Sequence, residues 1–299
     1  MNLPEIRYLV AVAEHRHFAR AAASVNISQP TLSGQIRKLE EELGVTLLER
    51  NNKRVELTPV GEQIVAHARE ILAQARAIEA AAQAARDPLV GPLKLGVIPT
   101  LAPYIMPLIL KPLRQSFPGL ILELWEDQTR SLIDGLRNHR LDAALLATPP
   151  ESPEITEIAL FEEPLVAALP LDHRMANAKK VTEESLSKEL LVLADGHCLA
   201  NQVLAACGAR RDRAGLPGTM QASTVETLVN LVAAGYGATL LPALATDSFR
   251  RREIVMLPLA CKTSRTIRLA SRPGFPRPQA LRALEKVIKR AVSAALARQ

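Results

Sequence analysis

Beyond residue 92 the chain alternates apolar runs bounded by turn residues with segments of helical apolar spacing, and this alternation constrains the fold most. The runs predict strands, and the amphipathic segments predict helices. Strands that alternate with helices over about 200 residues indicate open α/β sheets. The expected strands are 93–98, 120–125, 143–147, 165–169, 190–193, 239–241 and 265–270, and the expected helices are 104–117, 129–139, 224–234 and 280–297.

Three chemically active side chains follow expected strands. Thr100 comes after the first strand, Thr129 after the second, and Cys198 after the strand at 190–193. Ligands of open α/β sheets bind beyond the carboxyl ends of the strands. We therefore expect these three side chains to line one site.

Cys198 and Cys207 lie nine positions apart in a segment of good helix formers that ends at Gly208. Nine residues of helix separate two side chains by roughly 13 Å along the axis. A disulfide tolerates a Cα separation of only about 7 Å. The two cysteines can therefore be joined only if this expected helix unwinds, which is the behaviour of a switch.

The local sequence favours Cys198 as the reactive thiol. A helix N-terminus and a protonated His197 would both lower the pKa of its thiol. Cys207 has apolar neighbours and a late position in the helix, so it would act as the resolving thiol after Cys198 is oxidised to sulfenic acid. The alternative is that both are inert, buried small hydrophobes, which is the more common state of an arbitrary cytosolic pair.

The cysteine content and the apolar runs restrict the class of protein. Three cysteines without a C-x-x-C pair or zinc-ligand spacing predict neither a disulfide framework nor a metal site, and no cofactor is expected. No run approaches the ~18 apolar residues of a membrane span. We therefore expect a cytoplasmic globular protein without a membrane contact.

Positive charge is concentrated at the end of the chain. Residues 250–299 carry thirteen Lys or Arg against two Asp or Glu, whereas residues 1–60 carry eight against seven. Bulk charge is weak evidence of function. The simplest interpretation of the C-terminal excess is a solvated face.

The first 60 residues predict a helix-turn-helix. Helical spacing covers residues 3–13, a short Ala-rich helix covers 18–23, and a further helix starts after the N-cap Ser28, with Leu32 and Ile36 in its buried stripe. Polar residues on the exposed face of that helix, and basic residues of a following wing, are suited to base edges and phosphates. The candidate DNA-binding residues are Ser28, Gln29, Pro30, Thr31, Ser33, Arg37, Arg50, Lys53 and Arg54.

Residues 59–86 predict one long helix with a heptad seam about three repeats long. The seam consists of Ile64, Ala68, Ile71, Ala75, Ile78, Ala82 and Ala85. The same helix of a second subunit is the expected partner, and packing within the domain is the alternative. A dimer would pair two DNA-reading heads.

Several of these segments resemble the LysR-type transcriptional regulators, and the resemblance covers nearly all of the chain. The general family pattern is present in Ser28-Gln29-Pro30-Thr31-Leu32-Ser33 and Leu57-Thr58-Pro59-Val60-Gly61. The pattern of its peroxide-sensing members is present in Gly96-Val97-Ile98-Pro99-Thr100, Gln128-Thr129, Asp195-Gly196-His197-Cys198-Leu199 and Cys207. Two positions depart from it: Asn201 replaces a common Asp, and Thr219 lies near a common His.

The resemblance implies an all-α winged helix-turn-helix at 1–58, a dimerising linker helix at 59–88 and an α/β regulatory domain at 91–299. The regulatory domain would have two lobes like those of type 2 periplasmic binding proteins, lobe I at about 91–162 plus 268–299 and lobe II at about 163–267. The expected assembly is a dimer of dimers on double-stranded promoter DNA, with RNA polymerase as a further partner.

The implied function is transcriptional activation by hydrogen peroxide through a reversible Cys198–Cys207 disulfide, with peroxide bound by Thr100, Thr129 and His197. Two alternatives stay open from the sequence. One is a regulator that binds a small organic effector between the lobes, and the other is a thiol peroxidase. The helix-turn-helix disfavours an enzyme as the primary role.

Overall fold

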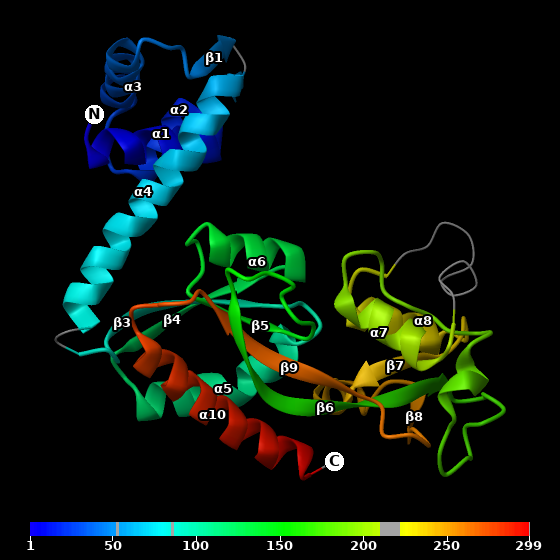
Figure 1. Cartoon of the computed structure of the whole chain (residues 1–299). Coiled ribbons are helices and arrows are strands. Elements are labelled where there is room, and N and C mark those ends of the chain that lie inside the picture. The colour runs from blue at the N-terminus through cyan, green and yellow to red at the C-terminus, as the bar shows by residue number, and fades with distance from the viewer. Residues whose placement is uncertain (52–53, 85–86, 210–221, 299) are drawn as a thin grey trace. The chain divides into compact units, whose positions relative to one another are not determined.

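A computed structural model of the chain describes residues 1–51, 54–84, 87–209 and 222–298. The chain forms two compact units, Met1–Gln83 and Ala84–Gln299 (Figure 1). Within the described ranges, no helix is both long and apolar enough to cross a membrane.

The first unit is a helix-turn-helix with a two-stranded wing and a long helix, which confirms the predicted fold of this region. Leu32 and Ile36 of the third helix are buried and share one apolar core with Leu9 and Val12 of the first. The elements are α1 Leu3–His15, α2 Phe18–Ser24, α3 Gln29–Leu43, β1 Leu48–Asn51, β2 Arg54–Leu57 and α4 Pro59–Ala84.

The apolar seam of α4 has two parts with different surroundings. Ala68 is buried against Ile6 and Val10 of α1, so the alternative of packing within the domain holds for this part of the seam. Ile71 and Ile78, further along the helix, are 39% and 73% exposed. The seam therefore leaves apolar side chains uncovered only along its later turns.

The described part of the second unit contains a seven-stranded sheet of order β4-β3-β5-β9-β6-β7, and β8 pairs with β6 beside this path. β3 pairs in parallel with β4 and β5, and the other pairs are antiparallel. Figure 1 shows α5 and α10 on one side of the β3–β5 sheet and α6 on the other. The bounds are β3 Gly91–Val97, β4 Leu120–Glu126, β5 Ala143–Leu146, β6 Thr156–Pro170, β7 Thr239–Pro242, β8 Ile254–Pro258, β9 Ser264–Ser271, α5 Ala102–Ser116, α6 Thr129–Arg137 and α10 Pro278–Leu296.

This unit has two apolar cores, and we refer to the regions around them as lobe I and lobe II. Lobe I is built on β3, β4, β5, α5, α6 and α10. Lobe II contains β7, β8, α7 Cys198–Ala206 and α8 Val225–Ala233, with the short helices η1 Glu183–Leu186, η2 Ala243–Ala245 and α9 Thr246–Phe249 in the same unit. Strand β6 contributes to both cores, so its middle residues, which pair with the first residues of β9, lie at the lobe junction.

One expected strand was wrong, one was too short and one strand was missed. Residues 190–193 form no continuous strand, because Leu190 pairs with Ala238 and Leu193 with Ala222, in two different segments. Each pairing is an isolated bridge, and the apolar run is there because it is buried in the core of lobe II. In addition, β6 is 15 residues long where only residues 165–169 were expected, and β8 was missed.

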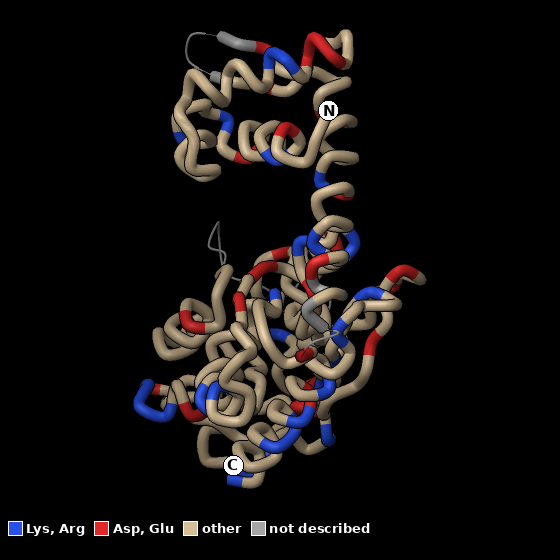
Figure 2. The backbone as a smooth tube through the Cα atoms, turned by 90° about the vertical axis from the view of Figure 1, so that its left-hand side faces the viewer, with Lys and Arg blue, Asp and Glu red and all other residues tan. Residues whose placement is uncertain are grey.

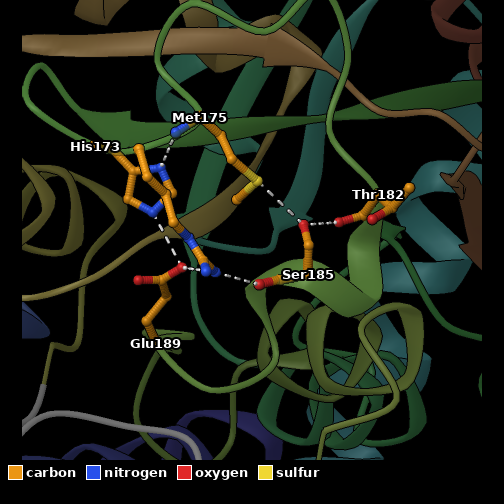
Figure 3. A network of polar contacts seen from close by, with 6 residues as sticks. His173, Met175, Thr182, Ser185 and Glu189 are labelled. Atoms are coloured by element: carbon orange, nitrogen blue, oxygen red, sulfur yellow. Dashed lines mark hydrogen bonds and ion pairs between the residues drawn. The ribbon is translucent and has the colours of Figure 1, made fainter.

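The chain between β6 and α7 has little regular structure and is held by a polar network (Figure 3). His173 Nε2 lies 3.0 Å from the Glu189 carboxylate, while His173 Nδ1 accepts the Met175 amide at 3.2 Å. Because Nδ1 is an acceptor, the ring proton lies on Nε2, facing the carboxylate. Arg174 donates to the same carboxylate at 3.3 Å. The network therefore fixes this segment of lobe II by side chains.

The C-terminal basic residues do not form one solvated face, so that interpretation was only partly right. Arg265 is fully buried in an ion pair, and Arg272 donates to main-chain carbonyls of lobe I. On α10, by contrast, Arg282, Lys286 and Arg290 are exposed. Figure 2 shows basic and acidic residues interspersed over both units.

Candidate functional site: the cysteine cleft of the regulatory unit

Helix α7 carries Cys198 at its first residue and Cys207 at its C-cap, and both thiols are free. The residue before the helix, His197, occupies the N-cap position and is 8% exposed. Gly196 has a φ of +93°, a conformation that glycine adopts at little cost. The intact helix therefore keeps the two sulfurs at opposite ends, as the sequence predicted.

A cavity of about 720 Å³ opens beside Cys198. Its walls come from α6, from the loop at 148–152 that follows β5, and from α7, so it lies between the two lobes. Its polar lining includes the side chains of Thr129, Arg130, Arg137, Ser152, His197, Asn201 and Gln202.

The half-buried thiol of Cys198 has a raised pKa, which corrects the expectation of a lowered one. Burial raises the pKa, while the positive charge of Arg265, the Thr129 hydroxyl and the amide at Leu199 act in the opposite direction. Burial also lowers the pKa of His197, so this side chain is a neutral imidazole at neutral pH and not the cation that was expected. The electrostatic support for a thiolate therefore comes from Arg265 and from the helix N-terminus.

Thr129 is the first residue of α6 and faces the thiol from lobe I. Its hydroxyl oxygen is buried and makes no hydrogen bond of ordinary geometry within the described chain, although it contributes to the pKa of Cys198. A buried hydroxyl of this kind costs free energy unless it finds a partner. Thr129 and Cys198 are thus placed to share a small polar ligand.

Thr100 is 2% exposed and is held by Arg265 instead of lining the cavity. Arg265 Nη1 donates to Thr100 Oγ1 at 2.9 Å, and Nη2 donates to the Thr100 carbonyl at 3.0 Å. Of the three side chains expected at one site, Thr129 and Cys198 meet directly, and Thr100 is linked to them through Arg265.

Arg265 and Glu163 are central to this site and were not predicted as site residues. They face each other across β9 and β6, both side chains are fully buried, and Arg265 Nη2 lies 2.8 Å from Glu163 Oε2. Glu163 Oε1 also accepts the Leu244 amide at 3.0 Å. Both strands carry further charged residues, such as Glu162 and Arg268, so this pair becomes informative only once the strand pairing is known.

Cys207, unlike Cys198, does not reach the cleft. Its side chain is 1% exposed within the core of lobe II. Burial and then the negative charges of Glu183 and Glu184 raise the pKa of its thiol to about 11. In this state Cys207 is a protonated, inaccessible thiol, in agreement with the predicted apolar surroundings.

Gln202, like Arg265 and Glu163, was not predicted as a site residue. From the middle of α7 its Nε2 donates to the Ala147 carbonyl at 2.7 Å, which joins lobe II to the loop after β5 of lobe I. Its Oε1 is buried without a hydrogen-bond partner in the described structure. Asn201, the departure noted in the sequence, is exposed at the cavity wall. Thr219, the other departure, lies outside the described residues.

In the first unit, the N-terminal half of α3 presents the predicted DNA-reading face. The Ser28 hydroxyl caps the helix by accepting the Thr31 amide at 3.2 Å, and Gln29 and Pro30 are exposed. Ser33 is half-buried, and Arg37 is exposed with an ion pair to Glu41 at 3.2 Å.

The wing carries the remaining predicted DNA-binding residues. Arg50 and Arg54 belong to β1 and β2, which pair in antiparallel fashion. Lys53, predicted at the tip, lies outside the described residues.

Comparison with protein families gives two matches that cover most of the chain. Residues 3–62 match the bacterial regulatory helix-turn-helix protein, lysR family, and residues 86–293 match the LysR substrate binding domain. This chain belongs to the LysR family. It is therefore a DNA-binding transcriptional regulator, and the α/β regulatory unit is the substrate-binding domain of that family.

Among LysR proteins, the chain is similar to peroxide regulators. It is 44% identical over 310 residues to the DNA-binding transcriptional dual regulator OxyR of Escherichia coli K12, covering 98% of this chain and 100% of that protein. It is 46% identical over 283 residues to the hydrogen peroxide-inducible genes activator of Dickeya chrysanthemi, covering 92% and 91%. A full-length OxyR variant from Pseudomonas aeruginosa superposes with a TM-score of 0.77 at 39% identity, covering 97% and 98% of the two chains.

Proposed function

We propose that this LysR regulator is switched by hydrogen peroxide through Cys198 and Cys207 and activates genes of the oxidative stress response. The observation that carries the proposal is the asymmetry of the two thiols. Cys198 faces the cleft beside Thr129 and the charge of Arg265, whereas Cys207 is sealed at the far end of the same helix. The similarity to peroxide-inducible activators supports it.

The chemistry has two balanced steps. The Cys198 thiolate attacks one peroxide oxygen, the O–O bond breaks, and the departing hydroxide takes a proton to form water. Cys207, deprotonated as it attacks, then forms the S–S bond at the sulfenic acid of Cys198, and a second water leaves. Two thiols are oxidised and one peroxide is reduced, and a dithiol reductant reverses the change. In this proposal Thr129, His197 and the Arg265-bound Thr100 position the peroxide.

The second step requires a large rearrangement. With α7 intact, the cysteines are separated by roughly 13 Å along the helix axis, so the disulfide forms only after the helix unwinds. Unwinding breaks the Gln202 contact with Ala147. The relation between the lobes would change, and with it the spacing of paired DNA-reading heads.

The domain and assembly assignments are part of this proposal. We assign 1–58 to the DNA-binding domain, 59–88 to the linker helix and 91–299 to the regulatory domain, with a lobe boundary near residues 162–163 and 267–268. The exposed Ile71 and Ile78 support pairing of linker helices in a homodimer, and a dimer of dimers follows the family pattern. Promoter DNA is read by Ser28 to Arg37 and by Arg50, Lys53 and Arg54, RNA polymerase is a further partner, and the location is cytoplasmic.

A second candidate function is supported by the size of the cavity. A volume of about 720 Å³ is far larger than the roughly 30 Å³ share of one water molecule, so the cleft has room for a small organic effector. In that case the cysteines would be inert, and the lobes would respond to a ligand held by side chains such as Arg130 and Arg137.

One experiment separates the two functions. The full-length protein, Cys198→Ser, Cys207→Ser and the control Cys261→Ser are titrated for free thiols before and after stoichiometric peroxide, and each is footprinted on promoter DNA. Cys261 is exposed and lies outside the cleft, so its variant should behave like the wild type. Loss of two thiols with a changed footprint supports the redox switch. An unchanged footprint response in Cys198→Ser excludes it in favour of an effector.

A further inference from the structure

Arg277 is a buried residue whose guanidinium donates hydrogen bonds to one short segment of main chain at the start of the regulatory unit. It occupies the N-cap position of α10 and is 5% exposed. Its Nε donates to the Pro88 carbonyl at 3.1 Å, Nη2 to the Val90 carbonyl at 2.9 Å and Nη1 to the Pro92 carbonyl at 2.6 Å. Three alternate carbonyls are thus held by one planar fork.

Residues 87–90 of this segment belong to the connector between α4 and β3, and Pro92 is the second residue of β3. No backbone amide in the described structure donates to the carbonyls of Pro88 and Val90 outside the helices and strands. Pro88 has no amide hydrogen, and the amides of Leu89 and Val90 donate to Asp87 within the connector, so these bonds do not tie it to the rest of the unit. The Arg277 side chain therefore supplies much of what fixes the connector to the regulatory unit.

The N-cap position of α10 is unfavourable for a cation such as Arg277. A helix N-terminus carries partial positive charge and favours anions or neutral caps such as Ser and Thr. Burial lowers the pKa of its guanidinium, and the charges of Asp142 and Asp87 oppose this shift without an ion pair to Arg277 within the described residues. A neutral cap would suit the helix better, so the arginine is explained by the carbonyls that it holds.

Contacts lead without a break from the cysteine cleft to this arginine. Arg265, whose charge acts on Cys198, pairs with Glu163, and Glu163 accepts the Leu244 amide. Leu244 belongs to η2, which packs against α10, and both elements contribute to the core of lobe I. The first residue of α10, Pro278, directly follows Arg277. Spatial continuity of this kind identifies a candidate route, and a mutational test must establish coupling.

We propose that Arg277 is a positioning residue of the switch, which fixes the connector to α10 so that a rearrangement at the lobe junction reaches the C-terminal end of the linker helix α4. The inference rests on the proposed redox function. Without the hydrogen bonds of the guanidinium, the connector could move relative to α10, and the rearrangement would not reach the linker helix. The thiol chemistry itself would be untouched, because Arg277 contacts none of the cleft residues named above.

The test uses the full-length protein with Arg277→Lys and Arg277→Gln. The matched control is Arg272→Lys, because Arg272 also donates to main-chain carbonyls, those of Leu136 and Leu141, but within lobe I. Three quantities are measured for each protein: the rate of disulfide formation, the melting temperature, and the ratio of promoter affinities between the dithiol and disulfide states.

We expect the Arg277 variants to form the disulfide at the wild-type rate. In coupled systems the ratio of affinities between the two states is roughly 5- to 150-fold, and in these variants it should fall to about 1. Arg272→Lys should keep the wild-type ratio even if it melts earlier. A wild-type ratio in both Arg277 variants overturns the proposal. If the wild type forms no disulfide, the proposed function fails instead, so the two failures are distinct.

A measurement on the wild type alone keeps the proposal testable if the variants do not fold. Amide hydrogen exchange at Leu89, Val90 and Gly91 is followed in the dithiol and disulfide states. A connector that transmits movement stays fixed, so we expect equal protection in both states. Loss of protection after oxidation would show that the connector is released, and this result contradicts the proposal.

Discussion

Arg265 and Glu163 face each other in adjacent strands at the junction of the two lobes, with 2.8 Å between Nη2 and Oε2 and both side chains fully buried. The same guanidinium holds the Thr100 hydroxyl and carbonyl, and its charge acts on the Cys198 thiol. The ion pair between β6 and β9 thus also acts on the reactive cysteine.

Loss of this pair should affect both stability and reactivity. Arg265→Gln leaves Glu163 buried without a counter-ion, which typically costs about 3 to 5 kcal/mol. It also removes the charge that favours the Cys198 thiolate, so peroxide should oxidise Cys198 more slowly. Urea unfolding and stopped-flow oxidation measure the two effects. The double variant Arg265→Gln with Glu163→Gln should recover part of the stability and none of the rate. Full recovery of the rate would show that Arg265 acts only by holding the fold.

The raised pKa of Cys198 predicts a steep pH dependence of oxidation. The thiolate is the nucleophile. Below the pKa its fraction rises about tenfold per pH unit, and burial places that pKa above the ordinary value of 9.0. The rate constant for peroxide should therefore keep rising through pH 9. Rapid-mixing kinetics between pH 6 and pH 9.5 test this, and a plateau near neutral pH would show that the thiol is already ionised.

A side chain at Gly196 should cost stability. A Cβ there would lie 2.2 Å from the oxygen at the end of the flexible Gln128 side chain, so Gln128 must move, and the φ of +93° disfavours any other residue. Gly208 is the matched control, because its φ of +59° is also positive but a Cβ added there would have no neighbouring atom within 4 Å. Gly208→Ala should cost about 1 to 2 kcal/mol, and Gly196→Ala should cost more and slow Cys198 oxidation.

Unfolding and oxidation kinetics of the two glycine variants measure this difference. Adding Gln128→Ala to Gly196→Ala should remove the excess cost. Equal costs for the two glycine variants would mean that the contact with Gln128 is unimportant.

The DNA-reading face should separate into residues that specify sequence and residues that bind any sequence. Gln29→Ala and Ser33→Ala should relax sequence preference by about 1 to 3 kcal/mol per lost base contact. Arg50→Ala and Lys53→Ala should weaken all sequences alike and flatten the salt dependence. Binding isotherms on operator and scrambled DNA at several salt concentrations distinguish the two classes. A uniform loss for Gln29→Ala would show that it contacts only the backbone.

Local sequence signals predicted the elements of the DNA-binding unit closely. Ser28 as N-cap and Pro59 at the start of α4 are marks that need no tertiary context. The wrong strand at 190–193 has the opposite cause, since a buried apolar run looks alike whether or not a neighbour pairs with it. Arg265 and Glu163 could not be paired from the sequence, because they lie 102 positions apart. The raised pKa of Cys198 depends on burial, which its helix position does not reveal.

The proposed switch requires α7 to unwind when Cys198 and Cys207 join. The disulfide lowers the entropy of the unfolded chain, which is equivalent to about 3 kcal/mol of stabilisation, but the helix that must melt is packed in the core of lobe II. We therefore expect little net change in the free energy of unfolding. The most direct measurement is amide hydrogen exchange over residues 199–208 in the dithiol and disulfide states, with the disulfide mapped in the same samples. We expect a mapped Cys198–Cys207 bond and much faster exchange across this segment after oxidation. Equal protection of residues 199–208 in the two states, with the bond present, would contradict it.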